Sequence, residues 1–269
     1  MAVVAGIDAL AASLGRLFVV VGVFDGLHLG HAYLLRHLVL EAAKRSARPA
    51  VVTFDHHPDE ILVGSAPPLL CDPEERLERL AAAGVEVTVV QTFDLALRMT
   101  PYDAFVRTIA DRVPLAGFLM TPDAAFGHER GGTVEAVTDL GHSIGYEVAV
   151  VPPFEVAGRP VRSADIRTAI ASGDLATAAK LLGRDVSVTG HLEPVGEGRR
   201  LVFDLPVALP PPGEYHVVAE AATWPGGQVV RGSGTVTIGG PESVLLRVDG
   251  MPSGERVRIT FAHQRVTSP

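Results

Sequence analysis

The sequence predicts an α/β protein in which a doubly wound parallel sheet is followed by a small all-β barrel. As far as residue 151, short apolar runs alternate with helical patterns, whereas from residue 186 onward short alternating runs are separated by Gly and Pro clusters. Strand–helix alternation is typical of βαβ units, and closely spaced short strands are typical of barrels or sandwiches. With 269 residues, of which 47% are hydrophobic, the chain is long enough to bury a large core.

The elements of the first part follow from apolar runs and helix-start signals. Pro73 suits the first turn of a helix, and Thr100 before Pro101 suggests an N-cap. We expect strands at 17–24, 49–54, 85–90, 116–120 and 146–151, and helices at 31–45, 73–83, 100–113 and 133–144.

The pattern changes after residue 151. Two short helices are expected at 163–171 and 174–182, and six strands at 186–189, 201–203, 215–219, 234–238, 243–248 and 256–261. This predicts two domains, 1–185 and 186–269. Trp224, in a Gly/Pro loop, is interpreted as a partly buried anchor.

Composition restricts the possible partners and compartment. A formal charge of −8 argues against a nucleic-acid binder. Cys71 is the single cysteine, which favours a reducing cytoplasm. The start of the chain has no basic leader, and its longest apolar run, Leu17–Phe24, is too short to span a bilayer. We therefore expect a soluble cytoplasmic protein with no membrane partner.

The segment Gly22-Val-Phe-Asp-Gly-Leu-His-Leu-Gly-His31 lies between the first buried strand and its helix, where open parallel sheets bind ligands. Its glycines allow close backbone approach, and the start of a helix offers free N–H groups to an anion. Two imidazoles at such a place suit the stabilisation of charge on phosphate. A P-loop is excluded, because neither Lys44 nor Lys180 follows a glycine-rich loop.

A bare His28-x-x-His31 pair would have simpler interpretations. It could decorate a surface loop, or it could bind a metal, but no third ligand cluster accompanies it, so no metal site is predicted. Asp55-His56-His57 is likewise interpreted as the loop at a strand end.

Further segments occur in a recognisable order. They are Thr53-Phe-Asp-His-His-Pro58, Leu69-Leu70 with Glu74-Glu-Arg-Leu77 and Gly84-Val85, Asp123 with Phe126-Gly127, Arg130 and Gly132, and Val161-Arg-Ser-Ala-Asp-Ile-Arg167. Together with the His-x-Gly-His segment, they resemble the nucleotidyltransferase part of bacterial bifunctional riboflavin kinase/FAD synthetases. The resemblance covers residues 16–185.

This resemblance implies a Rossmann-like fold and a reaction that joins FMN to the AMP part of ATP, giving FAD and pyrophosphate, with Mg²⁺ bridging the ATP phosphates. It implies catalytic roles for His28, His31 and Arg167. It implies nucleotide binding by Gly22, Phe24, Asp25, Gly30, Arg162 and Ser163. It implies an FMN side formed by Phe54, His57, Asp123, Phe126 and Arg130.

The chain also departs from the family pattern. Thr121 replaces a glycine, Ala124 an aromatic residue, Arg162 a serine and Ala164 a threonine. Arg162 could offset the lost hydroxyls near the phosphates or point to solvent. Asp25 could orient its loop, contact a metal through water, or act only as a cap.

The second part resembles the riboflavin kinase barrel with an eroded site. Arg200-Leu-Val-Phe-Asp-Leu-Pro206 stands where the family has Gly-Phe-Pro-Thr-Ala-Asn, and the family's catalytic Glu falls near Ser243, beside Glu242. We expect a persisting barrel without riboflavin phosphorylation. Two alternatives stay open: transfer to another phosphorylated acceptor, and a flavin- or nucleotide-binding regulatory protein without turnover.

Overall fold

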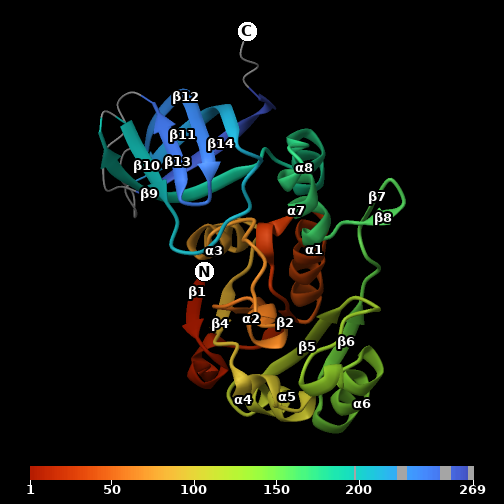
Figure 1. Cartoon of the computed structure of the whole chain (residues 1–269). Helices are drawn as coiled ribbons and strands as arrows, with labels where there is room; N and C mark the ends of the chain where they lie inside the picture. Colours follow the sequence, from red (N-terminus) through yellow and green to blue (C-terminus); the bar gives the residue numbers. More distant parts are fainter. Residues whose placement is uncertain (197, 223–228, 249–255, 266–269) are drawn as a thin grey trace. The chain divides into compact units, whose positions relative to one another are not determined.

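A computed structural model describes residues 1–196, 198–222, 229–248 and 256–265 (Figure 1). Trp224 lies outside these residues, so its predicted role stays a prediction. The chain divides into two compact units: Met1–Pro67 with Leu77–Pro160, and Pro68–Arg76 with Val161–Pro269. The predicted boundary at residue 185 remains a prediction.

The first unit is built on a six-stranded parallel sheet of order β1-β4-β3-β2-β5-β6. Its strands are β1 (Ala2–Ala5), β2 (Leu17–Val21), β3 (Arg48–Phe54), β4 (Val87–Gln91), β5 (Leu115–Met120) and β6 (Glu147–Val150). Its helices are α1 (Leu29–Lys44), α2 (Pro58–Leu62), α4 (Leu95–Arg98), α5 (Tyr102–Ala110) and α6 (Val134–Ile144), and α3 (Pro73–Ala82) runs from one unit into the other. The predicted doubly wound sheet is confirmed.

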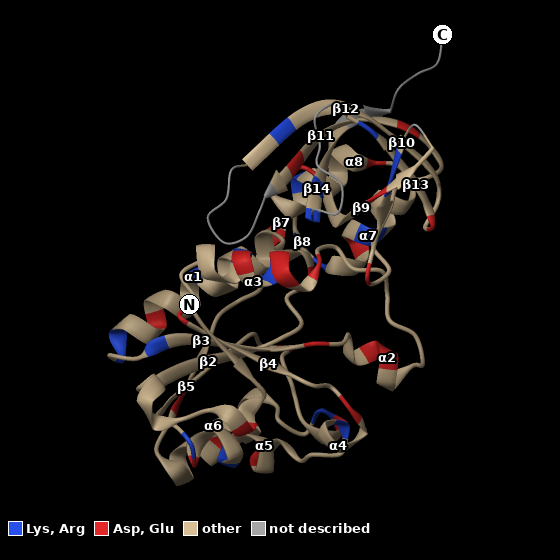
Figure 2. Ribbon diagram, turned by 90° about the vertical axis from the view of Figure 1, so that its left-hand side faces the viewer, with Lys and Arg blue, Asp and Glu red and all other residues tan. Residues whose placement is uncertain are grey.

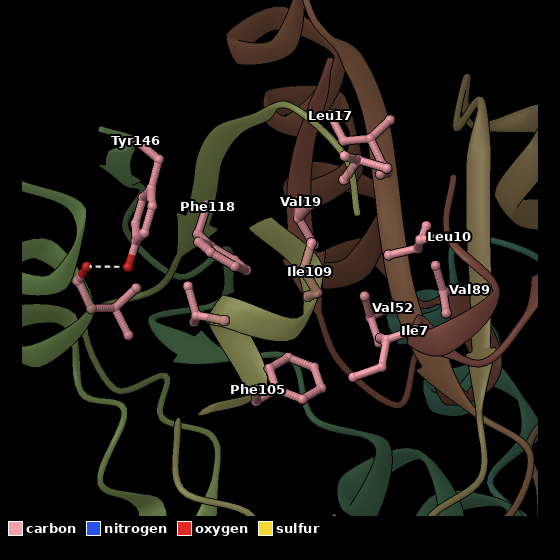
Figure 3. Packing of buried hydrophobic residues seen from close by; sticks show 14 of the residues in the cluster. Ile7, Leu10, Leu17, Val19, Val52, Val89, Phe105, Ile109, Phe118 and Tyr146 are labelled. Atoms are coloured by element: carbon pink, nitrogen blue, oxygen red, sulfur yellow. Dashed lines mark hydrogen bonds between the residues drawn. The ribbon is translucent and has the colours of Figure 1, made fainter. Parts of the chain in front are cut away.

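The strands are apolar because both sheet faces are covered. Figure 2 shows α1 on one face of the sheet and α5 and α6 on the other. The core includes Phe118, Ile109 and Tyr146 (Figure 3), and the Tyr146 hydroxyl donates to the Val137 carbonyl at 2.7 Å. Burial raises the pKa of Tyr146 to about 12, because the phenolate would lose its hydration.

Two details differ from the prediction. The first buried strand ends at Val21 rather than Phe24, because Gly22 leaves the sheet to begin a loop. Helix α5 has Pro101 as its N-cap, and Thr100 instead donates its hydroxyl to the Ala96 carbonyl at 2.8 Å, ending α4.

The topology creates a crevice between β2 and β5. From β2 the chain moves outward through β3 and β4, and it then returns to form β5 and β6 on the other side. In open sheets of this kind, ligands bind beyond the carboxyl ends of the strands at the point where the order reverses. The loops after Val21 and Met120 start there.

The second unit contains a closed antiparallel barrel of order β10-β13-β12-β11-β14-β9, which confirms the predicted barrel. Its strands are β9 (Ser187–Val195), β10 (Gly198–Val202), β11 (Gly213–Ala222), β12 (Val229–Gly240), β13 (Ser243–Arg247) and β14 (Arg256–Arg265), preceded by α7 (Ser163–Ala171) and α8 (Leu175–Leu182). A short hairpin, β7 (Glu155–Val156) and β8 (Arg159–Pro160), lies in the first unit.

Residues 68–76, here called the strap, belong to the second unit. Asp72 makes a bidentate ion pair with Arg256, whose Nη2 donates to Oδ1 at 2.5 Å and whose Nε donates to Oδ2 at 3.2 Å. Glu75 is fully buried, accepts a hydrogen bond from the Thr189 hydroxyl at 3.0 Å and pairs with Arg258 at 3.5 Å. The strap is therefore bound to the barrel through buried and half-buried charges.

Among the described residues, no helix combines the length and the apolar character that crossing a membrane would require.

Candidate active site

The loop after β2 has an unusual backbone path. Phe24, Gly26 and Leu27 have φ values of 53°, 77° and 35°. Positive φ costs little for glycine but about 1–3 kcal/mol for other residues, so it persists where surrounding contacts impose it. A Cβ at Gly22 would lie 3.0 Å from the Phe24 ring, so a side chain there would require this ring to shift by a few tenths of an ångström. We call residues 22–28 the signature loop.

The signature loop ends at the N-terminus of α1, where His28 is the N-cap. Its Nδ1 accepts a hydrogen bond from the His31 backbone N–H at 3.3 Å, so a neutral His28 carries its proton on Nε2. The His28 and His31 rings stack with centroids 3.7 Å apart and planes 16° apart. The structure thus brings the two predicted histidines together at a helix terminus suited to anions.

His31 is held in its neutral form. Burial, and secondarily the positive charge that His28 can carry, lower the pKa of His31 well below its ordinary value. Among the described residues, its buried Nδ1 has no hydrogen-bond partner. An anion beside His31 would oppose the lowering of its pKa and would give its Nδ1 a hydrogen-bond partner.

Phe24 and Asp25 are buried within the signature loop. Phe24 is 1% exposed, with its ring centroid 5.1 Å from that of His31, and Asp25 is 3% exposed. Gly30 lies in the first turn of α1. At Gly30 the helix start therefore presents backbone without a side chain.

A large hollow of about 590 Å³ adjoins the signature loop within the first unit. Phe54 is at its wall, with its ring centroid 5.3 Å from that of Phe93, and Phe126 and Arg130 also line it. Three of the predicted FMN-side residues therefore meet at one hollow. His57 is next to the lining residue Pro58 and caps α2 by accepting from the Asp59 N–H at 3.2 Å.

A small hollow of about 300 Å³ lies at the end of β5 and shares Phe126 and Arg130 with the large one. Asp123 lines this small hollow; its carboxylate accepts from the Thr121 hydroxyl at 2.9 Å, and its carbonyl accepts from Arg130 at 3.0 Å. Thr121, which stands where the family has glycine, thus holds the Asp123 side chain by a hydrogen bond.

The residues near position 163 that are predicted to bind phosphate belong to the second unit. Arg162 precedes α7 and is exposed, and Ser163 is the first residue of this helix. The Arg167 Nε donates to the Pro68 carbonyl of the strap at 2.8 Å.

Sequence reasoning missed much of the large hollow. Its wall also includes Leu62 of α2, Phe93 after β4 and Leu97 of α4. Apolar residues at strand ends look like core in a sequence, and helices of four or five residues give too little periodicity to detect.

No group of three or more His, Cys, Asp or Glu side chains in the described part of the chain could hold a metal ion.

The chain is similar in sequence to curated bacterial proteins over more than half of its length. Over 174 residues, the chain is 30% identical to the bifunctional riboflavin kinase/FMN adenylyltransferase of Haemophilus influenzae, covering 64% of this chain and 56% of that protein. With the protein of the same description from Pseudomonas fluorescens it is 27% identical over 219 residues, covering 77% and 70%. In the proteins of this description from Haemophilus influenzae, Buchnera aphidicola and Escherichia coli, the matched region spans only about three fifths of the protein.

A solved structure described as a macrolide-efflux protein from Streptococcus pneumoniae matches with a TM-score of 0.79 and 24% identity, covering 98% of this chain and 90% of that one. This similarity supports the two-part fold alone. The family model for FAD synthetase matches residues 11–165, which is more than half of the chain. The chain therefore belongs to the FAD synthetase family.

Proposed function

We propose that this protein is an FMN adenylyltransferase, which transfers the AMP part of ATP to FMN and releases pyrophosphate. The observation that carries the proposal is the stacked His28–His31 pair at the start of α1, beside an apolar hollow of about 590 Å³. A hollow of this size suits a cofactor-sized ligand. Family membership and the relatives' names support the same chemistry.

The reaction requires positioning and charge stabilisation. The FMN phosphate is already ionised near pH 7 and attacks the α-phosphorus of ATP, and the bond to pyrophosphate breaks. His28 donates from Nε2 to a phosphate oxygen, since its Nδ1 is occupied by the His31 N–H. Mg²⁺ bound with ATP supplies further neutralisation of phosphate charge.

The other predicted residues receive roles in this proposal. Phe54, Phe126 and Arg130 hold the flavin in the large hollow, with Asp123 and His57 beside it. Gly22 and Gly30 leave room for the nucleotide, and Phe24 and Asp25 shape the loop from inside. The predicted roles of Arg162, Ser163 and Arg167, which belong to the second unit, remain predictions.

We further propose that riboflavin phosphorylation is lost. Residues 200–206 lack the Thr and Asn of the family's kinase segment. The hollow at this place is about 180 Å³ and is lined by strap residues Asp72 and Glu74 together with Asp204 and Arg256. Such a space is small for a nucleotide and a flavin together.

The test is incubation with Mg·ATP plus FMN, and separately plus riboflavin, with chromatography of the products. FAD from FMN and no FMN from riboflavin is the expected result. Turnover with a different phosphorylated acceptor would favour another nucleotidyltransferase, and ATP binding without any product would favour a regulatory protein.

Two variants of His28 separate its chemistry from its structural role. His28→Ala removes both the imidazole and the N-cap acceptor, whereas His28→Asn keeps an oxygen that can cap α1. Both should lower turnover by about a hundredfold or more, as for one lost transition-state donor. Only His28→Ala should lose the cap's contribution of about 0.5–2 kcal/mol to the free energy of unfolding. A wild-type rate in His28→Asn would refute the assignment.

A further inference from the structure

Thr53 carries a hydroxyl in a strand whose other residues after Arg48 are apolar. It lies in β3, where the last six residues are all buried, and its own exposed fraction is 0%. A buried hydroxyl destabilises the fold unless it is hydrogen-bonded, and valine would fill nearly the same space. The threonine at this position therefore calls for a partner.

That partner is the signature loop. The Thr53 Oγ1 donates to the Val23 carbonyl at 3.0 Å, and the Gly22 N–H donates to the Val52 carbonyl at 3.0 Å. Two successive residues of β3 thus bond to two successive residues at the start of the loop. The side-chain bond extends the β2–β3 pairing, which ends at Val21 and Val52, by one further contact.

The loop beyond this contact depends on such fixed points. Phe24 and Leu27 hold positive φ without being glycine, and they lead directly to His28, which is 4% exposed. A strained path of this kind is kept only where its surroundings determine it. A displacement of about 1 Å at a catalytic group can cost on the order of a hundredfold in rate.

We propose that Thr53 is a positioning residue for adenylyl transfer: its hydroxyl fixes the Val23 carbonyl and thereby the path that places His28. This inference rests on the proposed function. It concerns a residue that lines neither the large nor the small hollow, and it acts through the backbone of the signature loop.

The chain offers a matched control in Thr88. This residue lies on the neighbouring strand β4, pairs with Val51 of β3, and is likewise 0% exposed. Its hydroxyl contacts the Met1 sulfur at 3.1 Å rather than the signature loop. Thr88→Val therefore removes a buried hydroxyl from the same sheet without touching the loop.

The experiment compares Thr53→Val, Thr53→Ser and Thr88→Val in the full-length protein. For Thr53→Val, we expect kcat for FAD formation to fall by about tenfold or more while KM for ATP changes much less, because the group acts on placement in the transition state. Thr53→Ser keeps the hydroxyl and should restore kcat to within about twofold of the wild type. Thr88→Val should also stay within that range, even where its thermal unfolding midpoint falls as far as that of Thr53→Val.

A second readout does not depend on turnover. In protein labelled with ¹⁵N-histidine, the His28 signals, assigned with His28→Asn, report its tautomer and surroundings. They should move in Thr53→Val and keep their positions in Thr53→Ser and Thr88→Val. Wild-type kcat together with unmoved His28 signals in Thr53→Val would overturn the inference, as would an equal loss of kcat in Thr88→Val. If the wild-type protein makes no FAD but the His28 signals still move in Thr53→Val, the proposed function would be refuted and the role of Thr53 in fixing the loop would be retained.

Discussion

Gly127 supports the wall of the large hollow, and its replacement by alanine should be severe. Its φ of 76° and ψ of 177° lie in a region essentially restricted to glycine. An added Cβ would lie 2.6 Å from the Tyr102 nitrogen and 2.7 Å from its Cα. These are backbone atoms at the start of α5, so either the helix or the loop must move.

The size of the effect follows from these two terms. The backbone conformation alone costs a non-glycine residue about 1–3 kcal/mol, and overpacking adds about 1–3 kcal/mol. We expect Gly127→Ala to lower the free energy of unfolding by about 3 kcal/mol or more. Because residues 126–130 line the hollow, KM for FMN should rise as well.

Gly131→Ala is the matched control in the same loop. Gly131 has φ of −64° and ψ of −22°, and a Cβ there would lie 3.4 Å from the His128 carbonyl oxygen, which is an ordinary contact. Its unfolding free energy should stay within about 0.5 kcal/mol of the wild type. Urea unfolding of both variants provides the measurement. Equal stability of Gly127→Ala and Gly131→Ala would refute this account of the loop.

Two further predictions concern charge. Because the pKa of His31 is lowered, below about pH 6.5 the unfolded chain takes up a proton at this residue that the folded chain does not. The free energy of unfolding should therefore decrease as the pH is lowered, by up to about 1.4 kcal/mol per pH unit. Urea unfolding at pH 7 and pH 5 should show a smaller fall in His31→Gln, and identical slopes would contradict the assignment. Arg256→Met leaves Asp72 half-buried without its bidentate partner and should cost about 1–3 kcal/mol. Arg231→Met, which breaks an exposed pair with Glu220, should cost less than about 1 kcal/mol by the same method; a reversed order would count against the strap interactions.

The sequence was sufficient to predict the order of the main strands and helices, because each carries several buried residues in a regular pattern. β1 was missed because it has four residues and alternates between half-buried and exposed. α2 and α4 were missed because each spans about one turn. Their identification requires the tertiary surroundings that hold such short helices.

The site shows a similar division. His28 and His31 could be placed together from sequence, because they lie three positions apart at the start of a helix. The positive φ of Phe24 and Leu27 could not be predicted from sequence, since neither residue type favours it. Phe93 and Leu97 carry no chemical signal of their own, and only the fold shows that they face a hollow.

The strap also decides how the protein can be cut. The chain passes from one unit to the other after Pro67, after Arg76 and after Pro160. A fragment that stopped at residue 185 would keep Asp72 and Glu75 but lose Thr189, Arg256 and Arg258, so carboxylates that the barrel now covers would face water. A barrel expressed alone would keep Arg258 without the carboxylate it pairs with. Neither half is therefore expected to fold independently, and limited proteolysis should release neither as a stable core.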